Sequence, residues 1–91
     1  MYGFVVVWRK ADVNDTSNDE VFSRRIKEFP WARINGPTVW CIKSYRRSAD
    51  IRQILMNYIG NNDRLYVFRF DGFSSYTSPE INEWLDGCEL T

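Results

Sequence analysis

The sequence predicts an α+β fold in which strands and helices alternate along a chain of 91 residues. Three observations predict it: an unbroken apolar run over residues 2–8, two later segments with apolar side chains at helical spacing, and a strand-like run over residues 64–70 with aromatic side chains at every second position. A chain of this length can build one core. We therefore expect a single domain over residues 1–91, with a core of residues 2–71 and a C-terminal docking tail of residues 72–91.

The first third of the chain predicts a strand, a polar loop and a helix. Residues 2–8 are continuously apolar, which is typical of a central strand covered on both faces. After the polar loop of residues 10–19, Ser17 and Glu20 have the spacing of a capping box and predict the helix start. Pro30 ends this helix. Its apolar stripe consists of Phe22, Ile26 and Phe29.

The middle of the chain predicts a hairpin followed by a second helix. A short edge strand near residues 31–34 and a longer strand at 38–43 flank the reversal signal Asn35-Gly36. Ser48 is a suitable N-cap for the helix, and Gly60 supplies its stop. The apolar side chains at helical spacing are Ile51, Ile54, Leu55, Tyr58 and Ile59.

The last strand has one face that is almost wholly aromatic. Its alternation separates Tyr66, Phe68 and Phe70 from Leu65, Val67 and Arg69. A short segment then begins at Pro79 and docks through Trp84 and Leu85. The order is that of a ferredoxin-like β-α-β-β-α-β fold, an antiparallel sheet with two helices on one face and a short C-terminal segment. We expect a second copy of the chain to cover the other face.

The charges cancel but are unevenly distributed. Twelve basic and twelve acidic residues give no bulk electrostatic case for a nucleic-acid or membrane ligand. All the bases lie at or before Arg69, whereas residues 71–91 carry five acidic side chains and no basic ones. The tail could therefore neutralise the basic body of its own chain or of a partner. Nine of the twelve bases are Arg, which suits bidentate contacts to carboxylate or phosphate.

The residue types limit the chemistry that this chain can perform. It contains no His, which excludes imidazole bases and His metal sites, so a metal would need carboxylates. Cys41 and Cys88 are expected to be free thiols in a reducing compartment. Residues 2–8 are too few for a membrane span and lack the basic start of a signal peptide. We therefore expect a cytoplasmic protein without a membrane partner.

The second half of the chain carries a recognisable order of short motifs between residues 38 and 85. Its members are Thr38 and Trp40; Ser48, Ala49, Ile51 and Arg52; Asn62, Asp63 and Leu65; and Trp84 and Leu85. This order resembles the SinR-like relatives of the small CRISPR adaptation protein called Cas-two. The first half agrees with that family by topology.

The resemblance implies a ferredoxin-like homodimer whose sheets face one another, with the C-terminal segment completing the partner's sheet. It also implies a nucleic-acid function, because founding members are metal-dependent nucleases or subunits that bind duplex DNA. In the nucleases an Asp directly follows the first strand, and two such carboxylates hold Mg²⁺. Here Arg9 and Lys10 stand at that point, and the available substitutes are Asp12 and Asp15.

These observations favour a non-catalytic homodimeric binding module that engages nucleic acid or a protein partner and needs no cofactor. One alternative is a Mg²⁺-dependent endonuclease acting on RNA or duplex DNA through Asp12 or Asp15. Another is a phage or mobile-element inhibitor or regulator of a host defence complex. The candidate nucleic-acid ligands are Arg9, Lys10, Lys43, Arg46, Arg47 and Arg52. The candidate dimer contacts are Tyr2, Phe4, Trp40, Arg69, Trp84 and Leu85.

Overall fold

The strands form one antiparallel sheet, as predicted, in a computed structural model that describes residues 1–72 and 78–88, apart from the side chains of Arg33 and Asn35. The strand order is β2-β3-β1-β4. The two central strands are therefore β1 and β3, and β2 and β4 lie at the edges. The strands are β1 (Tyr2–Arg9), β2 (Trp31–Asn35), β3 (Val39–Ser44) and β4 (Arg64–Phe70).

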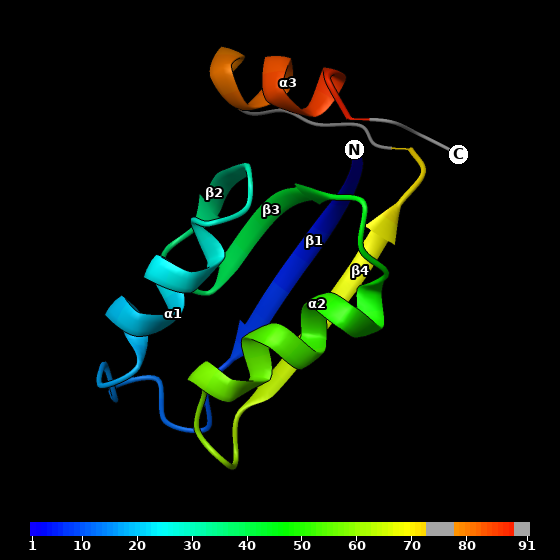
Figure 1. The fold of residues 1–91 in the computed structure, drawn as a ribbon. Helices are drawn as coiled ribbons and strands as arrows, with labels where there is room; N and C mark the ends of the chain where they lie inside the picture. The colour runs from blue at the N-terminus through cyan, green and yellow to red at the C-terminus, as the bar shows by residue number, and fades with distance from the viewer. Residues whose placement is uncertain (73–77, 89–91) are drawn as a thin grey trace.

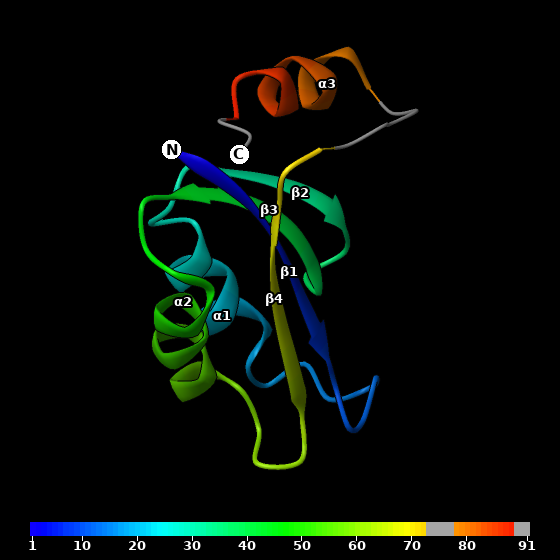
Figure 2. The ribbon, with the colours of Figure 1, turned by 90° about the vertical axis from the view of Figure 1, so that its right-hand side faces the viewer.

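Two helices lie on the same side of the sheet. They are α1 (Asp19–Ile26) and α2 (Ser48–Leu55), and a 3-10 turn, η1 (Met56–Tyr58), continues α2. Figure 2 shows α1 and α2 together on one face, with neither of them on the other. The third helix, α3 (Pro79–Asp86), lies beyond the end of the sheet where the chain begins (Figure 1). The two faces of the sheet therefore differ, because α1 and α2 cover one face and not the other.

The hydrophobic core fills the space between the sheet and the helices α1 and α2. Alternate side chains of β1, namely Phe4, Val6 and Trp8, point into it. The other members of this buried cluster are Phe22, Ile26, Trp40, Ile42, Ile51 and Leu55. The apolar stripes predicted for the two helices therefore account for the covered face of the sheet.

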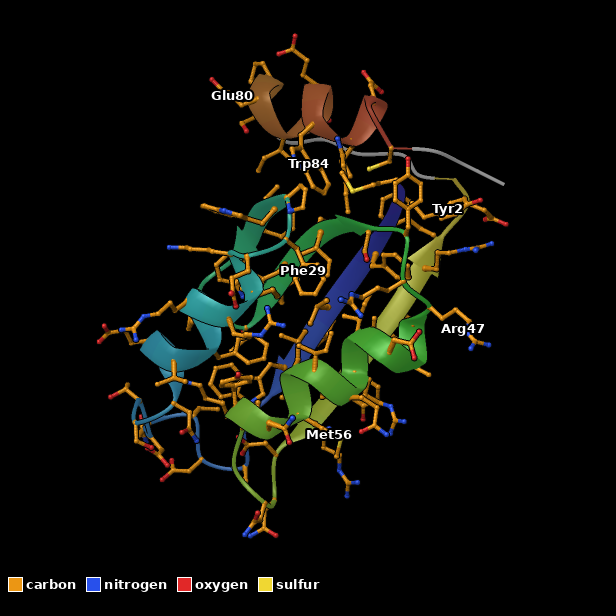
Figure 3. All side chains as sticks on the ribbon, in the orientation of Figure 1. Tyr2, Phe29, Arg47, Met56, Glu80 and Trp84 are labelled. Atoms are coloured by element: carbon orange, nitrogen blue, oxygen red, sulfur yellow. The ribbon has the colours of Figure 1, made fainter. Side chains whose placement is uncertain are left out.

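The opposite face of the sheet is covered at one end. Cys41 and Lys43 alternate with the core residues of β3 and so point to this opposite face. Lys43 places its Nζ atom 4.6 Å from the centre of the Trp84 ring, which brings α3 over that end. Figure 3 shows Trp84 projecting from α3 towards the sheet and Glu80 pointing away from it. Further along, Val5 and Val7 of β1 are partly exposed.

Both predicted N-caps are wrong by one position. Helix α1 is preceded by Asn18 rather than Ser17, because Ser17 belongs to the turn before it and donates its amide to Asp15 Oδ1 at 3.0 Å. Helix α2 has Arg47 as its N-cap residue, whose carbonyl accepts the amides of Asp50 and Ile51. Neither cap residue forms a side-chain cap bond.

Two other local predictions are confirmed. Pro79 occupies the first turn of α3, and Ser78 caps that helix by accepting the amide of Ile81 at 3.4 Å. The hairpin between β2 and β3 turns at Gly36, whose φ of 53° favours glycine. In the part of the chain that the structure describes, no helix has the length and apolarity that crossing a membrane requires.

Candidate functional site

The uncovered face of the sheet carries an apolar surface, called here the open-face patch, made of Val5, Val7, Tyr66 and Phe68. These side chains share one face because Val5 pairs with Phe68 and Val7 with Tyr66 in the antiparallel register. Tyr66 is 42% exposed and Phe68 57% exposed. Their rings lie parallel, with 6.2 Å between centroids and 1° between planes. Large aromatic side chains left open together in this way favour a contact surface.

The patch ends where Phe70 covers β1. Gly3 pairs with Phe70 in the register. The Phe70 ring occupies the space that a side chain at Gly3 would fill. A Cβ atom placed on Gly3 would lie 2.1 Å from Phe70 Cζ, far inside contact distance. The absence of a side chain at Gly3 therefore leaves room for the tip of the Phe70 ring beside the central strand.

A second feature lies at the other end of the same strands. Arg9 ends β1 and Arg64 begins β4, and the two residues pair directly in the register. Arg64 lines a depression of about 280 Å³ with Arg9, Lys10, Ala11 and Asn62. It also lines a neighbouring depression of about 320 Å³ that contains Arg52. We call Arg9, Arg64 and Arg52 the arginine row.

Most other cations already have a partner. Four form ion pairs with carboxylates: Lys10 with Asp19, Arg24 with Glu20, Arg25 with Glu28 and Arg47 with Asp50. Three lie over aromatic rings: Lys27 over Trp31, Lys43 over Trp84 and Arg69 over Tyr2. Among the side chains that the structure describes, Arg46 and the arginine row have no such partner. Three of these four guanidiniums are thus gathered at one end of the sheet.

The six predicted nucleic-acid ligands do not form one cluster. Arg9 and Lys10 lie at the carboxyl end of β1, whereas Lys43, Arg46 and Arg47 lie near its amino end, since Ser44 pairs with Tyr2. Figure 3 shows Arg47 near the beginning of α2. At the carboxyl end of β1, the predicted ligand Arg9 lies beside another arginine, Arg64.

Lys10 also lines the depression shared by Arg9 and Arg64, but its side chain is largely buried and paired. Its side chain is 8% exposed and forms an ion pair with Asp19. Its Nζ atom also donates to the carbonyl of Asp15 at 3.2 Å and lies 5.0 Å from the centre of the Trp8 ring. Lys10 therefore holds the loop after β1 against the start of α1.

Sequence reasoning missed Arg64, although a usable signal was present. Residues 64, 66 and 68 alternate on one face of β4, so Arg64 extends the aromatic row of Tyr66 and Phe68 with a charge. What the alternation could not show is that Arg64 stands opposite Arg9, because that pairing joins two distant parts of the chain.

The predicted substitutes for a metal-binding carboxylate organise the loop after β1. Asp12 Oδ1 accepts the amide of Asn14, and Asp15 Oδ1 accepts the amide of Ser17, both at 3.0 Å. Hydrogen bonding from the Ser17 side chain first, and from the Ser17 amide second, holds the pKa of Asp15 below its ordinary value. Over residues 1–72 and 78–88, no three acidic or thiol side chains are grouped so that they could hold a metal ion.

Another carboxylate, Asp63, ties the end of β1 to the loop before β4. It accepts hydrogen bonds from Trp8 Nε1 at 3.0 Å, from the amide of Ala11 at 2.9 Å and from the amide of Gly60 at 2.9 Å. The Ala11 amide is the largest of the influences that hold the pKa of Asp63 below its ordinary value. Asp63 therefore fixes the backbone on which Arg9 and Arg64 are mounted.

Two of the predicted dimer contacts lie in the core of the single chain rather than on its surface. Phe4 and Trp40 are completely buried in the core under α1 and α2, because their strand positions point to the helix-covered face. Leu85 is buried within the chain, and Trp84 packs against Lys43. Tyr2 and Arg69 contact each other, with the guanidinium carbon 4.6 Å from the ring centre. On β4, the exposed aromatic side chains are instead Tyr66 and Phe68 of the open-face patch.

Both cysteines are free and buried, so the predicted thiols are confirmed. Burial is the main cause that raises the pKa of Cys41 to about 11, and nearby Cys88 adds to the effect. Burial also raises the pKa of Cys88, although Lys43 opposes it. Protonated thiols are poor nucleophiles.

Two comparisons with known proteins give no information on function, so the evidence comes from the geometry of the structure. A scan against protein-family models finds no match to the chain. A search of curated proteins finds no significant sequence match. The resemblance to SinR-like and Cas-two-like proteins consequently stays a prediction.

Proposed function

We propose that this protein is a non-catalytic binding module that works as a homodimer, with the open-face patch buried between two copies. The observation that carries the proposal is the pair of parallel rings of Tyr66 and Phe68, which remain 42% and 57% exposed on a sheet face that α1 and α2 leave uncovered. Val5 and Val7 continue this apolar surface onto the central strand. A second copy offers the same apolar surface in a two-fold arrangement.

The scaffold is proposed to be ferredoxin-like and related to the SinR-like and Cas-two-like proteins. The strand order β2-β3-β1-β4, with antiparallel neighbours and two helices on one side, supports this assignment. In such a dimer the uncovered faces of the two sheets would meet. Helix α3 would lie at one end of the shared surface, where it packs by Trp84 and Lys43 in the single chain.

The end of β1 supports binding rather than cleavage. Arg9 and Lys10 follow the strand directly, and Asp12 and Asp15 direct their side-chain oxygens to amides of their own loop. The endonuclease alternative would need Asp12 or Asp15 to turn its oxygens away from these amides and towards a metal ion. A metal-dependent cleavage product that disappears in Asp12→Ala or Asp15→Ala would contradict the proposal.

Solution mass tests the dimer. Light scattering across a range of concentrations should give twice the mass of the chain. Phe68→Glu should give the monomer mass, because it would bury a charge between the two sheets. Val21→Glu is the matched control, since Val21 is an exposed apolar residue on α1, away from the open face. A monomeric wild type at high concentration, or a Phe68→Glu protein that remains dimeric, would refute the proposed assembly.

A further inference from the structure

We infer that the arginine row, Arg9, Arg64 and Arg52, binds the phosphodiester backbone of a nucleic acid. The inference deepens the proposed binding function and rests on it, but it does not depend on the dimer. The row lies beyond the Tyr66 end of the open-face patch, at the carboxyl end of β1 and the start of β4. A strand bound there would therefore contact the rim of the patch.

The pairing of Arg9 with Arg64 is the first observation. The two residues are direct cross-strand partners in the register of β1 and β4, and both are exposed. Like charges directly opposite one another destabilise a sheet, and neighbouring strands are only about 4.8 Å apart. Within the described residues neither guanidinium has an ion pair that would offset this repulsion. An anion between the two guanidiniums would convert the repulsion into a binding site.

The second observation is that most of the unpaired guanidiniums lie together at one end of the sheet. The described lysines all lie in an ion pair or over an aromatic ring, so the cations that are left without a partner are arginines. Three of these four arginines line two adjoining depressions, with Arg64 shared between them. The planar guanidinium fork presents two parallel donors to a phosphate, which a lysine cannot do.

The local carboxylate does not neutralise the row. Asp63 lines the same depression as Arg52 and Arg64, but its two oxygens already accept hydrogen bonds from Trp8, Ala11 and Gly60. Its charge partly offsets those of the arginines, and the row retains an excess of positive charge. Asp63 thus acts as a positioning residue that holds both backbone segments carrying Arg9 and Arg64.

The shape favours a polymer over a small anion. The two depressions share Arg64, and Arg9, Arg52 and Arg64 are all exposed, so the cations face solvent rather than enclosing one ion. A nucleic-acid backbone supplies a phosphate at every nucleotide and can contact the arginines in succession. Base edges are not needed for such contacts, so binding should depend weakly on sequence.

Fluorescence anisotropy with labelled duplex DNA, single-stranded DNA and RNA tests the inference. Three phosphate contacts predict a loss of duplex affinity of about 40-fold between about 50 mM and about 200 mM salt. Arg64→Gln should weaken binding by about tenfold and reduce the salt slope by about one. Arg64→Lys should restore part of the affinity. Arg46→Gln is the matched control, because Arg46 is also exposed and unpartnered but lies near the amino end of β1.

Each outcome has a separate meaning. Equal losses in Arg64→Gln and Arg46→Gln, or a binding curve insensitive to salt, would overturn the site. Polyglutamate that competes as well as DNA would overturn the nucleic-acid assignment. Thermal melting controls for folding, and Arg64→Gln should melt no earlier than wild type because it removes a like-charge pair. A dimeric protein that binds no nucleic acid refutes this inference alone, whereas a monomer that binds refutes the dimer alone.

Discussion

The indole of Trp8 donates a hydrogen bond of 3.0 Å to the carboxylate of Asp63, which lies 55 residues later in the chain. Trp8 is nearly fully buried, so its Nε1 atom has lost contact with water and depends on a protein acceptor. The same carboxylate accepts the amides of Ala11 and Gly60. One side chain therefore joins the end of β1, the loop after it and the loop before β4.

Asp63→Ala should lower the free energy of unfolding by about 2 kcal/mol or more, because it leaves the buried Trp8 indole without its acceptor. Two backbone amides would lose their partner as well, although water can reach them more easily. Urea denaturation, followed by tryptophan fluorescence, measures the change. Asp12→Ala is the control, since that carboxylate accepts one local amide in an exposed loop.

A double-mutant cycle separates the Trp8 contribution from the rest. Trp8→Phe keeps an aromatic ring in the core and removes the donor. If the hydrogen bond matters, the loss in Trp8→Phe/Asp63→Ala should be smaller than the sum of the two single losses. Strict additivity would show that the indole and the carboxylate contribute independently, contrary to the structure.

The stability should also fall in acid through Asp63. Its pKa in the folded protein lies below the ordinary value of 3.8, first because of the Ala11 amide and then because of Trp8, Gly60 and Lys10. A depressed carboxyl pKa contributes stability above the unfolded value, and this contribution is lost as the pH falls through the folded value. Between about pH 5 and about pH 2, the gap in unfolding free energy between wild type and Asp63→Asn should therefore narrow. A gap that stays constant over this range would contradict the proton linkage.

Local patterns predicted the elements of this fold well. The Asn35-Gly36 reversal and the alternation of β4 depend on residues close in sequence, and both appear in the structure. The run over residues 2–8 was harder to interpret, because it is apolar at every position and its alternation does not show which side chains face the helices. The run therefore fits Phe4 on a dimer surface as well as in the core, and the structure places it in the core.

The candidate site was predictable only in part, because it depends on contacts between distant segments. Arg9 was recognisable as an unusual charge at a strand end. Its pairing with Arg64 requires the register between β1 and β4, which no short motif encodes. The burial of Lys10 likewise depends on how the loop folds back so that Asp19 reaches it. The sequence therefore shows where the basic residues are, but only the fold shows which of them are free to bind a ligand.

Gly3→Ala should destabilise the protein by about 1–3 kcal/mol, because its new methyl group would displace the Phe70 ring from the central strand. Phe70→Leu should relieve part of this cost, so the double variant should lose less than the sum of the single changes. Gly72→Ala is the matched control: nothing lies within 4 Å of its Cβ position, and its unfolding free energy should stay the same or rise slightly. Equal unfolding midpoints for Gly3→Ala and Gly72→Ala would show that Phe70 does not pack on Gly3 in solution.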